Sequence, residues 1–284
     1  MSRERYILRA AAPDGIGILA DVMSHLASHR VNVTENHDFG DPQSCRFFIW
    51  ATFEAEPGFN EAAFRDGFAA LAARREMEWS LRPEQERPRA LILVSKGDHC
   101  LNDLLYRHRR GRLGAEIVGI VSNHTTTQWH ADRHDLPFLH NSVTPETKAD
   151  AESRLLELID ETRADLVVLA RYMQVLSNEL CRTLAGRCIN IHHSALPSFK
   201  GARPYHQAHE RGVKLIGATA HFVTADLDEG PIIAQDVVPV DHRLSAEKMA
   251  ELGKDIEARV LARAVRAHAE GRVFLNDKRT VVFE

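Results

Sequence analysis

The sequence predicts an α/β protein of two domains: an N-terminal ferredoxin-like βαββαβ domain, followed by a mostly parallel α/β domain. Short apolar stretches of strand length alternate with longer amphipathic stretches of helix length along the 284 residues. Residues 81–88 interrupt this alternation with prolines and charges, and a new apolar stretch begins directly afterwards at Ala90. We therefore expect a first domain over residues 1–83, a linker over 84–88 and a second domain over 89–284.

Six elements are expected in the first domain, in ferredoxin-like order. They are strands over residues 6–10, 31–38, 46–53 and 76–81, and helices over 16–29 and 60–74. The first strand and helix are joined by the turn Ala12-Pro13-Asp14-Gly15-Ile16-Gly17. In this turn we expect Asp14 to cap the helix and Gly17 to permit a close approach of the backbone.

The second domain is expected to hold a mostly parallel sheet between helices. Its apolar run over residues 166–170 has no polar alternation, which is typical of a strand buried on both faces. The expected strands cover 90–95, 116–122, 137–140, 166–170, 187–191 and 215–223, and the expected helices cover 100–110, 145–162, 178–185 and 246–270. A terminal hairpin is expected over 272–283.

Composition excludes several classes of partner. The net charge of −4 gives no basis for a nucleic-acid surface, and the basic cluster near Arg109 is interpreted as a solvated helix end. No apolar run approaches the ~18 residues that a membrane span needs. The first residues lead straight into a strand rather than a signal peptide, and the four cysteines form no Cys-x-x-Cys pair. We expect a cytoplasmic protein with reduced thiols.

Three complementary polar groups are predicted near the ends of two neighbouring strands. Asn190 and His192 lie two residues apart in a strand and therefore point the same way, while Asp228 follows the next strand in a polar loop. An amide, an imidazole and a carboxylate suit attack on a carbonyl, as oxyanion donor, proton carrier and orienting group. We expect Asp228 to deprotonate the attacking group as well. Singly, Asn190 or His192 would be read as a turn residue that satisfies nearby backbone groups.

These residues stand in a pattern that resembles the folate-dependent formyltransferases. The matching motifs are Asn190-Ile191-His192, Leu196-Pro197-Ser198-Phe199-Lys200-Gly201, and His221-Phe222-Val223 with Asp228 and Gly230. The resemblance covers residues 89–284 and implies that Asn190, His192 and Asp228 are catalytic. It also implies that a folate is the substrate, that no metal or further cofactor is needed, and that main-chain groups of one loop hold the pterin ring. The residues implied for that pocket are Met173, Gln174, Leu176 and Val223.

Departures from the family pattern suggest the acceptor of the formyl group. Where the glycinamide ribonucleotide enzymes carry a phosphate-binding Gly-Ser-Asn-Leu loop, this chain has Ser95-Lys96-Gly97-Asp98, whose carboxylate would repel a phosphate. The added nucleic-acid-binding domain of the tRNA enzymes is not expected. His193 replaces the proline usual in the transferases and resembles the deformylase branch of the family. Water is then the acceptor, and the expected reaction converts 10-formyltetrahydrofolate to tetrahydrofolate and formate, in the one-carbon balance that serves purine biosynthesis.

The first domain resembles the ACT domains, which bind amino acids and pair into homo-oligomers. The resemblance implies a regulatory site formed by Asp14, Gly15, Gly17 and Asn32, with glycine or methionine as the candidate effector. The turn is equally explained by helix capping alone.

Three other functions stay open from the sequence. The chain is compatible with a formyltransferase for an unrecognised amine, and with a non-catalytic folate or amino-acid sensor. A metal hydrolase is suggested by His192-His193, His206-x-x-His209 and His221. It is disfavoured because prolines break that stretch and no His-Glu-x-x-His motif is present.

Overall fold

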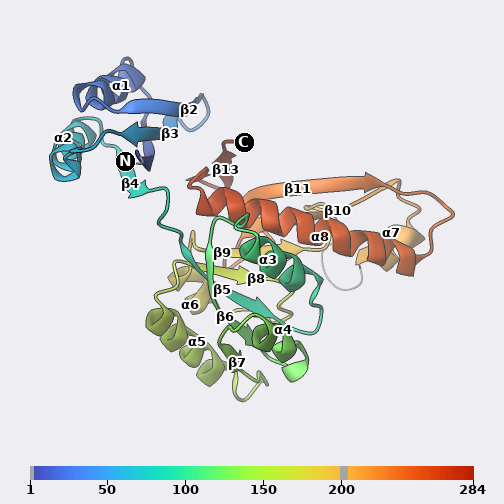
Figure 1. Cartoon of the computed structure of the whole chain (residues 1–284). Helices are drawn as coiled ribbons and strands as arrows, with labels where there is room; N and C mark the ends of the chain where they lie inside the picture. Colours follow the sequence, from blue (N-terminus) through green and yellow to red (C-terminus); the bar gives the residue numbers. More distant parts are fainter. Residues whose placement is uncertain (1–2, 199–203) are drawn as a thin grey trace. The chain divides into compact units, whose positions relative to one another are not determined.

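The computed structural model describes residues 3–198 and 204–284, which form two compact units (Figure 1). The first unit extends to Arg87 and includes Glu270–Asp277 and Val281–Glu284, and the second comprises Pro88–Ala269 and Lys278–Thr280. The boundary near residue 87 agrees with the expected linker. The terminal segment differs from the expectation, because most of it groups with the first unit rather than with the second.

The first unit has the predicted ferredoxin-like order. Its elements are β1 (Glu4–Pro13), α1 (Ile18–Ser28), β2 (Asn32–Asp41), β3 (Arg46–Ala55), α2 (Glu61–Arg74) and β4 (Glu78–Pro83). The strands form an antiparallel sheet in the order β2-β3-β1-β4. Helices α1 and α2 bury one face of this sheet, where Leu8 and Phe53 pack against Phe64 and Phe68.

The other face of this sheet is covered by the end of the chain. Strands β12 (Val273–Asn276) and β13 (Arg279–Val282) form a hairpin. Phe274 and Phe283, which lie in and beside this hairpin, pack with Phe48 and Trp50 of the sheet. The indole nitrogen of Trp50 also donates to the carbonyl of Glu270 at 3.0 Å. The hairpin was predicted, but its place in the core of the first unit was not.

One local prediction in this unit is wrong. Helix α1 begins at Ile18 with Gly17 as its N-cap, and no side chain caps it. Asp14 lies three residues before that cap, and its amide donates to the carbonyl of Cys45 at 2.7 Å. Gly17 has φ of 86°, a left-handed conformation that glycine adopts without strain, and this sets where the helix starts.

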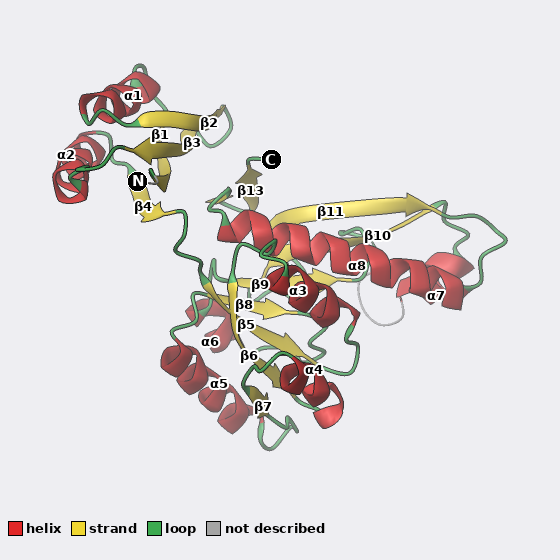
Figure 2. Ribbon diagram, in the orientation of Figure 1, coloured by secondary structure: helices red, strands yellow, loops and turns green. Residues whose placement is uncertain are grey.

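The second unit is an α/β domain built on a seven-stranded sheet (Figure 2). Its strands are β5 (Arg89–Val94), β6 (Glu116–Ser122), β7 (Phe138–His140), β8 (Leu166–Leu169), β9 (Cys188–His192), β10 (Leu215–Phe222) and β11 (Ile232–Pro239). Its helices are α3 (His99–Arg109), η1 (Thr125–Thr127), α4 (Gln128–Arg133), α5 (Lys148–Thr162), α6 (Asn178–Thr183), α7 (Pro204–Glu210) and α8 (Ala246–Ala269). The sheet order is β11-β10-β9-β8-β5-β6-β7, and only the pairs of β10 with β9 and with β11 are antiparallel. This confirms the expected mostly parallel sheet.

Both faces of the large sheet are buried. Helices α5 and α6 pack on alternate residues of β5 and β8, including Leu91 and Val167, while the intervening Ile92 and Val168 are equally inaccessible. Helix α8, the long red helix of Figure 1, packs against β9, β10, β11 and α3. None of the helices within the described ranges is both long enough and apolar enough to span a membrane.

A close backbone approach places the loop after β10. A Cβ built on Gly230 would lie 1.7 Å from the carbonyl oxygen of Phe222, so only glycine fits there. The turn at Gly230 brings the chain back as β11, which pairs with β10 and was not predicted. This fold-back holds the intervening loop, with Asp228, beside the ends of β9 and β10.

Candidate active site

Strand register brings Asn190 next to His221. These two residues are direct partners across β9 and β10, and Nδ2 of Asn190 lies 3.3 Å from Nε2 of His221. The other ring nitrogen, Nδ1 of His221, lies 2.9 Å from the carbonyl of Phe222 and must donate to it. In the neutral ring Nε2 is therefore an acceptor. The hydrogen bond that the Asn190 amide nitrogen donates to it orients the Asn190 side chain.

His192 and Asp228 form a buried pair. Nδ1 of His192 lies 3.2 Å from Oδ2 of Asp228, and the two side chains are 6% and 12% exposed. The second carboxylate oxygen lies 3.7 Å from Nε2 of His221. Asp228 has φ of 56°, a left-handed conformation that aspartate and asparagine tolerate better than most residues.

The charge of Asp228 is set by these contacts. Burial raises the pKa of this carboxyl, but the hydrogen bond from His192 and the proximity of His221 outweigh burial and hold the pKa well below its usual range. Asp228 is thus ionised at neutral pH and fixes Nδ1 of His192 as the protonated nitrogen. The structure brings together all three residues singled out from the sequence, and it adds His221. The sequence signal for His221 is its place in the His-Phe-Val motif. From the sequence, it was not grouped with Asn190, His192 and Asp228.

These side chains line a cavity of about 780 Å³. Its wall also includes the four residues expected to hold a pterin ring, Met173, Gln174, Leu176 and Val223. The amide of Met173 donates to Oγ of Ser95 at 2.9 Å, so this N–H is already used within the protein. At Met173, only the main-chain carbonyl group is therefore left for the expected contact with a ligand.

Two side chains of the loop after β5 are bonded within the protein. Oγ of Ser95 donates to Oδ1 of Asn123 at 2.7 Å, and the carboxylate of Asp98 lies 2.9 Å from Nε2 of His130. A phosphate-binding loop would offer free donors at the start of the helix. Helix α3 begins after Asp98 without a side-chain cap, so the lack of a phosphate cradle stays a prediction that rests on the negative charge of Asp98.

A buried carboxylate forms the back of the cavity. Glu257 of α8 is 1% exposed, and it accepts hydrogen bonds from Tyr205 and His99, both at 2.8 Å. The guanidinium of Arg171 lies 3.3 Å from the same carboxylate. Burial raises the pKa of Glu257, while His99 and Arg171 together lower it below its ordinary value. Glu257 was not expected from the sequence, where its only signal is an acidic residue within the apolar stripe of α8.

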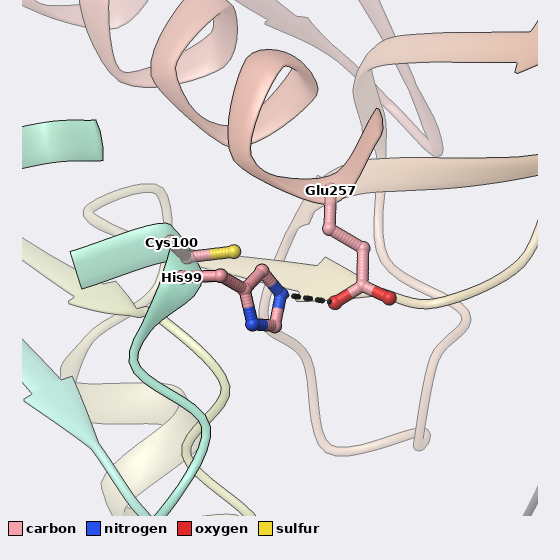
Figure 3. A group of neighbouring side chains, drawn as sticks. All are labelled: His99, Cys100 and Glu257. Atoms are coloured by element: carbon pink, nitrogen blue, oxygen red, sulfur yellow. Dashed lines mark hydrogen bonds and ion pairs between the residues drawn. The ribbon is translucent and has the colours of Figure 1, made fainter. Parts of the chain in front are cut away.

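His99, Cys100 and Glu257 place their ligand atoms close enough for a metal ion (Figure 3). The donor set does not suit one, because Arg171 and Tyr205 already occupy the carboxylate. Burial raises the pKa of the Cys100 thiol well above its usual value, whereas metals bind the thiolate. We therefore interpret the cluster as a hydrogen-bond network.

The remaining predicted residues lie elsewhere. Asp14, Gly15 and Gly17 lie exposed in the turn between β1 and α1, and Asn32 lies exposed at the start of β2. Of the motif at 196–201, Leu196, Pro197 and Ser198 precede α7, while Phe199, Lys200 and Gly201 fall outside the described residues.

Comparison with known proteins gives a consistent result. Residues 88–265 match the formyl transferase family. The chain is 48% identical over 280 residues to formyltetrahydrofolate deformylase of Corynebacterium sp., which covers 98% of both chains, and 43% identical to that of Escherichia coli, covering 99% of both. The crystal structure of formyltetrahydrofolate deformylase from Burkholderia mallei superposes with a TM-score of 0.95 at 51% identity, covering 99% of this chain and 100% of that one. Glycinamide ribonucleotide transformylase 1 from Symbiobacterium toebii gives a TM-score of 0.67 at 31% identity, covering 72% of this chain and 98% of that one.

Proposed function

Because this chain belongs to the formyl transferase family and to its formyltetrahydrofolate deformylases, we propose that it is a hydrolase that converts 10-formyltetrahydrofolate and water into tetrahydrofolate and formate. The observation that carries this function is the similarity to a deformylase relative at 48% identity, which covers 98% of this chain and therefore includes the N-terminal unit. The transferase structure from Symbiobacterium toebii covers only 72% of the chain. The geometry of the second unit supplies the chemistry.

Asn190 serves as the oxyanion donor. When water adds to the formyl carbon, the carbonyl oxygen gains negative charge and needs a fixed hydrogen-bond donor. The contact of Asn190 with His221 uses one of the two amide hydrogens and leaves the second for the substrate oxygen. Losing such a donor costs roughly 10²–10³ in rate in enzymes that use one.

His192 carries the proton and Asp228 supports it. Asp228 accepts the Nδ1 hydrogen of His192, which leaves Nε2 as the basic nitrogen. From the sequence, Asp228 was expected to remove the proton from the attacking group. A carboxylate whose pKa lies well below its usual range is a weak base, so we assign that step to His192. Asp228 then orients the imidazole and stabilises the imidazolium by its charge.

The second half of the reaction uses the same proton. The imidazolium of His192 donates it to N10 as the C–N10 bond breaks, and the oxyanion re-forms a carbonyl. The products are tetrahydrofolate and formic acid, which loses its proton to solvent. No redox step or extra reactant enters this balance.

The pterin ring is assigned to the cavity wall after β8. Gln174 and Leu176, together with the Met173 carbonyl, offer main-chain groups, and Val223 offers an apolar surface. A flat heteroaromatic ring is bound well by apolar walls with a few fixed polar groups. We assign no metal and no cofactor besides the folate, and we place the enzyme in the cytoplasm, since its four cysteines are unpaired.

One assay tests the function. The purified chain is mixed with 10-formyltetrahydrofolate alone, and tetrahydrofolate and formate are quantified. Equal amounts of both products are expected without any added amine. Product formation that depends on an added amine would contradict hydrolysis and identify a transferase.

We further propose that the first unit is an ACT-like regulatory domain, on the basis of its βαββαβ order and of the exposed turn between β1 and α1. Asp14, Gly15, Gly17 and Asn32 are the residues assigned to an effector, with glycine or methionine as the candidates, and the active form is a homo-oligomer. Control of this kind suits a reaction that depletes the formyl-folate used in purine synthesis.

The regulatory proposal is tested with the full chain. Removing residues 1–88 would strip the partner from Phe274 and Phe283, so truncation does not isolate regulation. Instead, the hydrolysis rate is measured with each amino acid, for the wild type and for Asn32→Ala, and the oligomeric state is measured by sedimentation. A change of 5- to 150-fold that the variant loses is expected, which corresponds to about 1–3 kcal/mol of coupling. A monomer that no amino acid affects would contradict the proposal.

A further inference from the structure

Two consecutive histidines at the end of β9 each bury a nitrogen that has no protein partner. These atoms are Nε2 of His192 and Nδ1 of His193, and neither has a hydrogen bond within the part of the chain that the structure describes. Buried polar atoms are almost always bonded, and an ordered water is the usual partner where no protein group reaches. Both residues line the catalytic cavity. The two nitrogens therefore indicate a water position beside the catalytic residues Asn190, His192 and Asp228.

The two rings lie close to each other. Their centroids lie 4.9 Å apart with the ring planes inclined at 63°. Neighbouring rings can share one water, because a water that donates to two acceptors at about 2.8 Å spans roughly 4.5 Å between them. We infer that His193 accepts a hydrogen bond from the water that attacks the formyl carbon, and so aims the water oxygen while His192 takes its proton.

His193 is kept in the state that this role requires. An imidazole accepts a hydrogen bond only while one nitrogen is unprotonated. Burial, together with the nearby charges of Arg171 and His192, lowers the pKa of His193 to about 4. Its neutral form is therefore the one present at physiological pH.

The network behind the cavity holds this arrangement. Arg171, whose charge disfavours protonation of His193, pairs with Glu257 at 3.3 Å. Tyr205 presents its ring to His193 at a centroid distance of 6.3 Å and is itself bonded to Glu257 at 2.8 Å. Glu257, shown in Figure 3, thus fixes two of the groups that surround His193. This gives the buried carboxylate a purpose that the three catalytic residues do not explain.

The role of His193 rests on the proposed hydrolysis and completes its atom balance. The water oxygen forms a bond to the formyl carbon, and the carbonyl electron pair moves to the oxygen that Asn190 stabilises. One water proton goes to Nε2 of His192 and is later passed to N10. The other stays on the new hydroxyl group, still directed at His193, and leaves in formic acid.

The test compares His193→Leu with His193→Asn. Leucine removes the acceptor, whereas the asparagine side-chain oxygen replaces an acceptor near the position of Nδ1. For His193→Leu we expect kcat to fall about tenfold to a hundredfold, the range seen when a nucleophile loses its orientation. The KM for 10-formyltetrahydrofolate should stay unchanged, and His193→Asn should recover part of kcat. His140→Leu, an exposed histidine on β7, is the matched control and should behave as wild type.

A competing nucleophile separates this role from a packing defect. Hydroxylamine is added, and formylhydroxamate is measured against formate. Loss of a specific water position should raise the hydroxamate-to-formate ratio in His193→Leu, which a merely damaged site would leave as it is. If His193→Leu keeps kcat within about threefold and keeps the wild-type ratio, the inference is wrong. If wild type releases no formate at all, the proposed function fails instead, and the two failures are told apart.

Discussion

Replacing Asp228 by asparagine tests the central pair of the mechanism. The substitution removes one charge and keeps the shape of the side chain. Asparagine also tolerates the left-handed backbone at this position, where φ is 56°, so no strain is added to the loop. The loss of activity then reports the charge and the lost acceptor.

The expected effect follows from the geometry of the pair. Two unit charges 3.2 Å apart interact with roughly 5 kcal/mol at an effective dielectric constant of about 20. Desolvation of both groups offsets part of this. Since 1.36 kcal/mol is tenfold in rate, we expect kcat to fall by about 10²–10⁴. An amide that donates to Nδ1 of His192 would also force the hydrogen onto Nε2 and remove the base.

The assay is formate release at saturating 10-formyltetrahydrofolate, with folate binding measured separately. Asp226→Asn, an exposed aspartate two residues earlier in the same loop, makes the same charge change and should leave kcat unaltered. A variant of Asp228 that keeps more than about a tenth of the wild-type kcat would refute the role given to this carboxylate.

Stability gives a second readout on the same variant. Because the folded-state pKa of Asp228 lies below its ordinary value of 3.8, the ionised group stabilises the protein above that pH, and this stability is lost as the pH falls through the folded pKa. The stability gap between wild type and Asp228→Asn should therefore be present at neutral pH and should narrow in acid, in denaturant titrations at several pH values.

Four further outcomes are expected. Gly230→Ala drives a Cβ into the carbonyl of Phe222 and should lower both the melting temperature and kcat; a variant that matches wild type in both would show that the loop is not held there. Phe274→Ala should lower the free energy of unfolding by about 3–5 kcal/mol in denaturant titrations. A loss under about 1 kcal/mol would contradict the packing of the terminal hairpin in the core of the first unit. The pKa of His193 is near 6.5 in the unfolded chain and about 4 in the folded chain. Wild type therefore loses stability as the pH falls from about 6.5 to about 4. His193→Leu should lose roughly 2 kcal/mol less than wild type between pH 7.5 and 5, and equal losses would contradict the lowered pKa. Dialysis against a chelator should leave activity unchanged, whereas a stoichiometric metal whose removal abolishes activity would overturn the assignment of the His99 cluster as a hydrogen-bond network.

Patterns along the chain predicted most strands of the two sheets and the shared direction of Asn190 and His192. Period-two spacing placed Asn190 and His192 on one side of a strand, and unbroken apolar runs predicted a sheet buried on both faces. The short elements α4 and β11 were not found. Residues 232–239 read IIAQDVVP, without regular alternation of polar and apolar side chains, and the strand follows a Gly-Pro turn that is typical of a loop. The helix start at Gly17 was misplaced, because the nearby aspartate is the commoner N-cap residue.

By itself the sequence determined the class of fold, the order of elements in each unit and the chemical types gathered near residues 190 and 228. Only the tertiary structure decided that His99, Arg171 and Tyr205 meet at Glu257, and that the last strands complete the core of the first unit. It also decided that His221 orients Asn190. Residue spacing reports which side chains share a face of one element, and that information is local. Contacts between distant segments depend on strand register and on how separate elements pack, which no periodicity along the chain records.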